Sequence, residues 1–321
     1  MLSVIKNTGK AAVFTAGLAG LLTVTSFVVQ PKDNSEDDGI HDGLANGILA
    51  EPDETIDVLV VGDSEVYAAI MPLRMWEKQG ITAYACGTGA QKLGYTFDFV
   101  RKNAETQSPD VVVLETNTLY RELSYDDVLY NRAEGLFPFF AYHSRWKSVT
   151  KRDLNPAVEY THVSETKGYS FSEDIVPADD SGYMTVSDEK EPIQSISRTY
   201  VKKISDFCKK NGSELILLST PSTLNWNYPR HNSVQELADE IGASYIDMNI
   251  LRDEVPIDWQ TDTKDSGDHM NYTGAVKVSD YLGSYLIETG KVRSHKGDKA
   301  YSQWDKAAEE FNNTINTNEQ S

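Results

Sequence analysis

Short apolar runs alternate with longer helix-like segments along the chain, and this alternation limits the fold more than any other feature. Three of the runs are Asp57–Val61 (DVLVV), Asp110–Leu114 (DVVVL) and Glu214–Ser219 (ELILLS), and Ala243–Asp247 adds a fourth. Runs that are apolar throughout are typical of strands buried on both faces of a parallel sheet. We therefore expect a sheet whose strands run side by side in the same direction.

The segments between these runs have the length and spacing of helices. Two of them end just before Gly212 and Gly242, and glycine commonly terminates a helix. The expected helices are Ala68–Gln79, Lys92–Thr106, Ile196–Asn211, Ser233–Ile241 and Ala275–Thr289. Strand–helix alternation of this kind predicts an α/β fold, a three-layer α/β/α sandwich around a mostly parallel central sheet.

The N-terminus carries an uncharged segment, Ala11–Gln30, which is long enough to cross a bilayer as a helix. Lys6 and Lys10 precede it, and acidic residues follow from Asp33 onward. The positive-inside rule then predicts a single-pass protein of the cell membrane, with a cytoplasmic N-terminus and an extracellular remainder. A cleaved signal peptide is the alternative, although no small-x-small cleavage site or lipobox cysteine follows the segment.

The chain divides into four expected parts. Residues 1–30 form the anchor or signal peptide, and 31–54 form a polar, acidic linker. One domain is expected over 55–290, with an insertion around 150–190 that is rich in Ser, Asp, Glu, Tyr and Gly. Residues 291–321 form a polar tail whose end is expected to be disordered.

Charge and cysteine content exclude some classes of function. The chain has 49 acidic and 30 basic side chains, a formal net charge of −19, which repels nucleic acid. Cys86 and Cys208 either pair in an oxidising compartment or remain as two buried thiols. Neither belongs to a metal-binding spacing, so we expect no metal and no cofactor.

The first candidate for chemistry is Ser64, in the sequence Gly62-Asp63-Ser64 directly after the run DVLVV. Catalytic groups of open α/β sheets lie beyond the carboxyl ends of the strands. A serine on a tight turn there exposes its hydroxyl for attack and its backbone N–H for the oxyanion. The alternative is that Asp63 and Ser64 only cap a helix, since both residue types are preferred at that position.

The second candidate is His269, in an acidic loop just before the last expected helix. Serine needs a neighbouring imidazole to accept its proton, and a carboxylate must orient that imidazole. Two carboxylates qualify, Asp265 four residues earlier and Asp268 one residue earlier. The residues alone do not decide between them.

Oxyanion donors are expected at two further strand ends. Asn117 follows the run DVVVL, and its side-chain amide can point toward a developing oxyanion. Gly87 and Gly89 follow a short expected strand, ITAYA, and glycine allows a backbone N–H to approach closely. An ordinary turn is the alternative for both glycines.

In this order the motifs resemble those of the SGNH (GDSL-like) hydrolase family, over roughly residues 55–290. The resemblance implies a flavodoxin-like fold with Ser64 as nucleophile, Gly89 and Asn117 as oxyanion donors and His269 as base. Two features depart from the family pattern: Ser266 stands where the acid usually lies, and Glu115-Thr116-Asn117-Thr118 replaces Gly-x-Asn-Asp. In addition, Ala90 competes for the family's glycine position.

The anchor and the C-terminal motif are most similar to those of exported Gram-positive members of that family. These include the D-alanyl transfer protein of teichoic acid modification and surface-polysaccharide O-acetyltransferases. The resemblance implies a serine esterase or acyltransferase that acts on cell-surface carbohydrate or teichoic acid through a Ser64 ester, beside a membrane-bound O-acyltransferase. The alternatives are a non-catalytic scaffold of the same fold and a binding module for wall polymer.

Two aromatic and basic segments are candidates for substrate binding. Stacking of a sugar on Trp146, with hydrogen bonds from His143 or Arg145, would form an acceptor site. An amphipathic loop with a half-buried tryptophan is the alternative. Trp226 lies after the run ELILLS and is a candidate for the rim of the pocket at the Ser64 edge of the sheet.

Overall fold

The computed structural model describes residues 2–40 and 42–318, which form two units. The first consists of Met1–Gly43 and Ser124–His162, and the second of Leu44–Leu123 and Val163–Ser321. The larger, second unit contains the whole sheet and the residues around Ser64.

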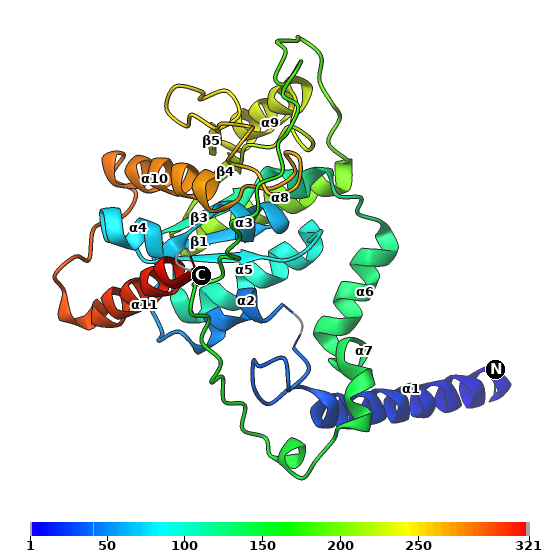
Figure 1. Ribbon diagram of the computed structural model, residues 1–321. Coiled ribbons are helices and arrows are strands. Elements are labelled where there is room, and N and C mark those ends of the chain that lie inside the picture. The colour runs from blue at the N-terminus through cyan, green and yellow to red at the C-terminus, as the bar shows by residue number, and fades with distance from the viewer. Residues whose placement is uncertain (1, 41, 319–321) are drawn as a thin grey trace. The chain divides into compact units, whose positions relative to one another are not determined.

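The sheet of the second unit has five parallel strands in the order β2-β1-β3-β4-β5 (Figure 1). The strands are β1 (Val58–Gly62), β2 (Ala83–Gly87), β3 (Val111–Glu115), β4 (Glu214–Ser219) and β5 (Ser244–Asp247). The three central strands are almost entirely buried, as their uninterrupted apolar runs predict. This confirms the expected parallel sheet.

The strand order changes direction at β1, and this position organises the site. From β1 the chain first adds β2 on one side and then returns to add β3 on the other. Gly62 pairs with Gly87, and Val61 pairs with both Cys86 and Leu114, so these three strands end at the same edge. Such a switch point leaves a crevice where ligands of open α/β sheets bind.

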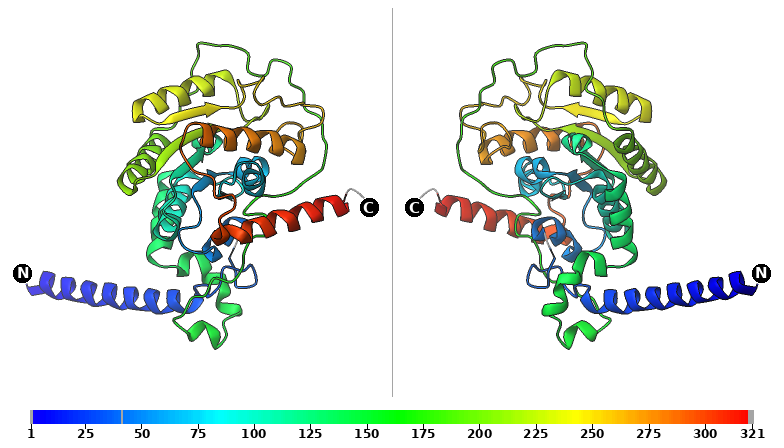
Figure 2. Two further views of the ribbon diagram at one scale, coloured as in Figure 1. Left: turned by 90° about the vertical axis from the view of Figure 1, so that its left-hand side faces the viewer. Right: turned by 90° about the vertical axis from the view of Figure 1, so that its right-hand side faces the viewer.

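Helices cover both faces of the sheet (Figure 2), which confirms the three-layer sandwich. On one face, α10 (Tyr272–Glu288) packs against both α3 (Ser64–Ala69) and α4 (Pro72–Gln79). Helices α5 (Leu93–Gln107) and α8 (Ser195–Asn211) pack together on the other, and α8 also contacts α9 (Tyr228–Ile241). Side chains such as Val58, Val60, Met75 and Leu282 form the core below the first layer.

Two of the expected helices differ most from the sequence prediction. The helix expected over 68–79 is two helices, because Pro72 disfavours a helical conformation at Met71, which is extended. Helix α9 begins five residues earlier than expected, at Tyr228, because the Asn227 side chain accepts a hydrogen bond from the Arg230 backbone N–H at 2.9 Å.

The expected polar tail contains a helix, α11 (Ser302–Asn318), preceded by a short 3-10 helix η5 (Lys299–Tyr301). Trp304 is fully buried in it, and its ring lies 5.7 Å from that of Trp76 on α4. Ala308 and Ile315 of this helix are also buried, and Phe311 packs against Tyr169 and Phe171. These apolar residues are few and widely spaced in a polar segment, so the sequence did not indicate a packed helix.

The first unit is built around the N-terminal helix α1 (Leu2–Val29), within which Thr8–Val29 is long and apolar enough to cross a membrane. Its other helices are α6 (Tyr125–Leu136), α7 (Phe139–Tyr142), η3 (His143–Lys147) and η4 (Arg152–Leu154). The expected linker is not simply extended: Asn34 exchanges hydrogen bonds with the backbone of His162 at 2.7 and 2.9 Å.

The expected insertion around 150–190 corresponds to a long irregular segment, which holds no regular helix or strand between 155 and 194. Its first residues, to His162, belong to the first unit. The remaining short elements are α2 (Gly43–Asn46), η1 (Gly47–Ala50) and η2 (Thr116–Tyr120). Cys86 on β2 and Cys208 on α8 are free and buried, and burial raises the pKa of both thiols, that of Cys208 to about 12.

Candidate active site

Ser64 is the first residue of α3 and follows β1 after a single residue, Asp63. The Asp63 side chain accepts a hydrogen bond from the Glu65 backbone N–H at 3.1 Å, so Asp63 is the cap of this helix. The capping role considered for both residues therefore falls to Asp63, and the Ser64 hydroxyl takes another partner. Gly62 permits the turn, since a Cβ there would lie 2.7 Å from that of Glu115.

The partner of Ser64 is His269, which comes from the loop before α10. Ser64 Oγ and His269 Nε2 are 2.8 Å apart, and His269 Nδ1 lies 2.6 Å from Asp265 Oδ2. These two contacts form a hydrogen-bonded chain from the serine hydroxyl through the imidazole to the carboxylate. This is the arrangement in which imidazole takes the serine proton and carboxylate stabilises the imidazolium.

Asp265 and Asp268 hold different positions around His269. Asp265 contacts the residue twice, because its Oδ1 also accepts the His269 backbone N–H at 2.6 Å. The nearest Asp268 oxygen lies 3.7 Å from Nδ1, beyond hydrogen-bond distance. The Asp268 carboxylate instead accepts a hydrogen bond from the Asn225 side chain.

The loop conformation explains how an acid four residues before the histidine reaches it. Ser266 and Gly267 both have positive φ, 62° and 94°, so the backbone folds back between Asp265 and His269. Only glycine fits at 267, since a Cβ there would lie 2.0 Å from Thr223 Oγ1. The Ser222 hydroxyl fixes the loop by donating to the Gly267 carbonyl at 2.9 Å.

Asn117 follows the carboxyl end of β3 and bonds to Asp63, the residue before Ser64. Its Nδ2 donates to Asp63 Oδ2 at 3.0 Å, and its Oδ1 accepts from Arg230 Nη1 at 3.4 Å. An amide nitrogen has two hydrogens, so a second donor remains for an oxyanion. Asn117 is therefore held next to the residue that precedes Ser64.

The two candidate glycines differ in their surroundings. Gly87 ends β2 against the nucleophile turn, where a Cβ would lie 2.5 Å from the Asp63 carbonyl oxygen. Gly89 is exposed in the following turn, and a Cβ there would meet open space. Packing therefore requires glycine at 87, whereas at 89 the absence of a side chain only leaves the backbone accessible.

Buried acids surround Ser64, and the sequence prediction missed them. Glu65 and Glu115 are almost fully buried, and burial followed by the charges of neighbouring carboxylates raises the pKa of each well above the usual range. Asp63 has no exposed side-chain surface and pairs with Arg121 Nε at 2.7 Å. The only sequence signal for this group was the position of its members at the ends of β1 and β3.

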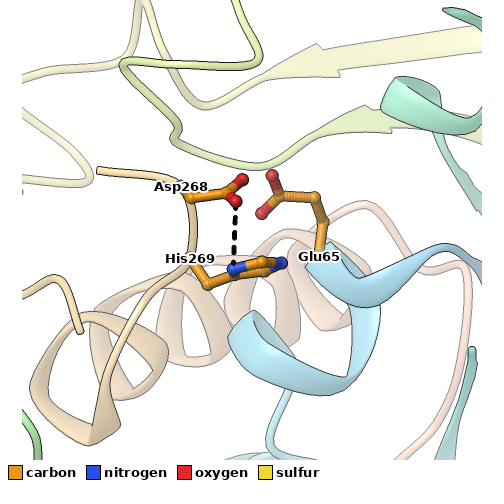
Figure 3. Close-up of side chains that lie close together, drawn as sticks. All are labelled: Glu65, Asp268 and His269. Atoms are coloured by element: carbon orange, nitrogen blue, oxygen red, sulfur yellow. Dashed lines mark ion pairs between the residues drawn. The ribbon is translucent and has the colours of Figure 1, made fainter. Parts of the chain in front are cut away.

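Glu65 Oε1 accepts a hydrogen bond from Asn225 Nδ2 at 2.8 Å, while Glu65 Oε2 has no hydrogen-bond partner among the described residues. Figure 3 shows the carboxylates of Glu65 and Asp268 facing the imidazole of His269. One ligand atom from each of these three lies within 4.8 Å of the others, a spacing that would suit a metal ion. However, both ring nitrogens already have partners, Ser64 and Asp265, which a metal would have to displace.

The predicted substrate-binding residues are divided between the two units. Trp226 is buried, and its indole N–H donates to Asp247 Oδ2 at 3.0 Å, so its ring is not open to a sugar. His143, Arg145 and Trp146 belong to the first unit. Arg145 is buried and its guanidinium is hydrogen-bonded within that unit, while His143 and Trp146 are exposed.

Comparison with known proteins gives likenesses of fold. No protein-family model and no curated protein matches the sequence. Similar solved structures include a GDSL-like lipase from Bacteroides thetaiotaomicron, 12% identical, with a TM-score of 0.37 over 77% of this chain and 98% of that one. A psychrotrophic esterase from Pseudoalteromonas sp. is 9% identical, with a TM-score of 0.38 over 74% and 100% of the two chains.

An acetyl-xylooligosaccharide esterase from a Geobacillus species is 12% identical, with a TM-score of 0.39 over 74% of this chain and 95% of the other. What the site can do chemically follows from the contacts of Ser64 and His269.

Proposed function

We propose that this chain is a serine acyl-ester hydrolase or acyltransferase that works through an ester of Ser64. The observation that carries the proposal is the continuous hydrogen-bonded line from Ser64 through His269 to Asp265, with distances of 2.8 and 2.6 Å. Both contacts are within the range at which a base activates a nucleophile. The side chain of Asn117 and the backbone of Gly89 or Gly87 supply the oxyanion donors.

In the first half of the reaction, Ser64 Oγ attacks the carbonyl carbon of an acyl ester while His269 Nε2 takes the hydroxyl proton. The negative charge develops on the carbonyl oxygen, where one fixed donor lowers the barrier by roughly 3–4 kcal/mol. The tetrahedral intermediate then collapses: its bond to the alkoxy oxygen breaks, and His269 returns the proton to the leaving alcohol. The product is an acyl ester on Ser64.

In the second half, a hydroxyl group attacks the Ser64 ester with the same exchange of protons through His269. If the hydroxyl belongs to water, the product is a carboxylic acid. If it belongs to a sugar or a polyol, the acyl group is transferred. Ser64 exposes only 7% of its surface, so limited access of water would favour transfer to an acceptor that fits the site.

The site of action proposed for the enzyme is the outer face of the cell membrane. The apolar stretch Thr8–Val29, with Lys10 near its start and acidic residues after it, supports a single-pass anchor with a cytoplasmic N-terminus. The proposed substrate is a cell-surface carbohydrate or a teichoic-acid-like polymer, and the proposed donor is a membrane-bound O-acyltransferase. These last assignments rest on the sequence resemblance.

Hydrolysis of 4-nitrophenyl acetate by the purified chain tests the proposal. Ser64→Ala removes the nucleophile and should abolish turnover, whereas Ser148→Ala, which changes an exposed serine of the first unit, should not affect it. Adding glycerol as an acceptor and measuring acetylglycerol against acetate separates transfer from hydrolysis. Wild-type turnover no faster than that of Ser64→Ala would favour a non-catalytic scaffold.

A further inference from the structure

The aromatic segment that follows α6 packs against the last turns of α1. The Phe139 backbone N–H donates to Ser26 Oγ at 3.1 Å, and α7 contacts α1. Leu22, Ser26 and Val29 are wholly or partly buried, and their spacing places them on one face of the helix. Other apolar side chains of α1, such as Val24, are exposed.

Arg145 holds this segment to the end of α1, where Lys32 also bonds to a helix carbonyl. Arg145 Nη1 donates to the Val29 carbonyl at 2.7 Å, and Arg145 Nη2 pairs with Asp153 at 2.9 Å. Lys32 Nζ donates to the Phe27 carbonyl at 3.0 Å. The last carbonyls of a helix lack partners within it, and cations stabilise that end. These contacts fix residues 136–154, which we call the collar, at the level where α1 ends.

The outward side of the collar is apolar, aromatic and basic. Leu136, Trp146 and Leu154 expose 74%, 67% and 60% of their surfaces, and Lys147 and Lys151 are exposed beside them. Large apolar side chains so exposed indicate a surface with a partner. Tryptophan with flanking cations is the composition found where a protein meets lipid headgroups.

We propose that the collar is a membrane-interface element that inserts Trp146 into the headgroup region of an anionic bilayer and retains α1 as a permanent anchor. The occupant is lipid because the collar is hydrogen-bonded to the end of the apolar span and so lies at the depth of the interface. The collar is basic although the whole chain has a net charge of −19, which suits anionic headgroups.

Loss of residues 1–29 by cleavage would remove the Val29 carbonyl that accepts from buried Arg145 and the Ser26 hydroxyl that accepts from the Phe139 backbone, and this argues for retention of α1. The inference rests on the membrane anchor of the proposed function and is independent of Ser64.

Quenching of tryptophan fluorescence by brominated lipid tests this directly. The full chain is reconstituted, without any other protein, into vesicles of equimolar phosphatidylcholine and phosphatidylglycerol, whose acyl chains are brominated near the glycerol backbone. Of the five tryptophans, only Trp146 is exposed; the other four are buried in the second unit: Trp76, Trp226, Trp259 and Trp304. We expect strong quenching in the wild type, its loss in Trp146→Phe, and its persistence in the matched control Trp259→Phe.

Equal emission with brominated and ordinary lipid would overturn the proposal and indicate a protein partner for the collar. The intact mass of the chain purified from cell membranes provides a second readout: a mass that includes residues 1–29 is expected, and a chain that begins after them overturns retention. Ester hydrolysis is measured on the same wild-type sample. Absence of quenching with hydrolysis intact overturns the collar proposal alone. Quenching without hydrolysis overturns the Ser64 proposal alone.

Discussion

His269 has two ring nitrogens with different roles, and Asp265 determines which is which. The Asp265 carboxylate accepts hydrogen bonds from His269 Nδ1 and from the His269 backbone N–H. Because a carboxylate can only accept, the ring proton lies on Nδ1, and Nε2 accepts from the Ser64 hydroxyl. Asp268 is adjacent in sequence, but its carboxylate is directed to Asn225. The two aspartates are therefore expected to differ greatly in their effect on the reaction.

Asp265→Asn should lower kcat for 4-nitrophenyl acetate by about 10⁴-fold, because an amide at this position favours the wrong tautomer of the imidazole. Asp268→Asn is the matched control and should cost roughly tenfold or less, since it changes a group that does not bond to the ring. Steady-state kinetics of the two variants measures the difference. A larger loss in Asp268→Asn would reverse the assignment of the acid.

Glu65 should make the stability of the protein depend on pH. Burial, and then the nearby charges of Glu115, Asp63 and Asp268, raise its pKa, while the hydrogen bond from Asn225 lowers it. Arg121 is the basic group of this cluster and pairs with Asp63. A raised folded-state pKa gives stability that is present below the unfolded value and is lost as pH rises through the folded value.

Glu65→Gln should therefore melt at a higher temperature than the wild type at pH 8, with a smaller difference at pH 5. Calorimetry at both pH values measures this, and Glu122→Gln, at an exposed position, is the control with no expected change. A variant with the same shift at both pH values would show that the carboxylate does not retain its proton in the folded state.

At the scale of elements, α11 packs within the second unit through several aromatic contacts, of which that of Trp304 is the most deeply buried. Trp304 packs against Trp76 and lies beneath the Lys167 ammonium, 4.9 Å from the ring. Lys167 in turn forms a buried ion pair with Glu51 at 2.6 Å. Removing the indole would leave a cavity and weaken the support of both cationic and aromatic partners.

Trp304→Ala should reduce the free energy of unfolding by about 3–5 kcal/mol, the usual cost of deleting a buried tryptophan. Urea denaturation measures the change, and Lys306→Ala, at an exposed position on the same helix, should stay within about 0.5 kcal/mol of the wild type. A similarly small effect of Trp304→Ala would mean that α11 is not packed as described.

Elements that depend on local pattern were predictable from the sequence, and those that depend on a distant contact were not. The strands β1, β3 and β4 follow from runs of apolar residues, and α8 follows from its spacing and from Gly212. Helix α11 was not predicted, because Trp304 packs against Trp76 on α4, which is far away in the sequence. The break before Pro72 had a local signal, since proline restricts the residue before it.

At the scale of the whole molecule, two segments that are far apart in the sequence belong to the same unit. Residues 124–162 interrupt the sandwich domain and join the N-terminal helix, as the hydrogen bonds between Asn34 and His162 illustrate. Nothing in the local pattern of either segment indicates this pairing. His143, Arg145 and Trp146, which were predicted to bind substrate, lie in this interruption. Their sequence does not indicate that they belong to the first unit.

The members of the candidate site that lie at the ends of strands were predictable from the sequence. Ser64 and Asn117 follow β1 and β3, whose carboxyl ends meet at one edge of the sheet, and His269 had the residue type that a serine needs. The buried carboxylates Glu65 and Glu115 were not predictable, because an acid next to a strand is usually exposed. Their burial and raised pKa values are evident only from the packing around them.

A fluorophosphonate probe tests the central claim most directly, because only an activated serine displaces its fluoride and forms a bond from Oγ to phosphorus. The purified chain is incubated with the probe, and the labelled peptide is located by mass spectrometry. We predict a single modification at Ser64 in the wild type, lost in Ser64→Ala and strongly reduced in His269→Ala. Equal labelling of the wild type and Ser64→Ala would contradict the assignment of Ser64 as the nucleophile.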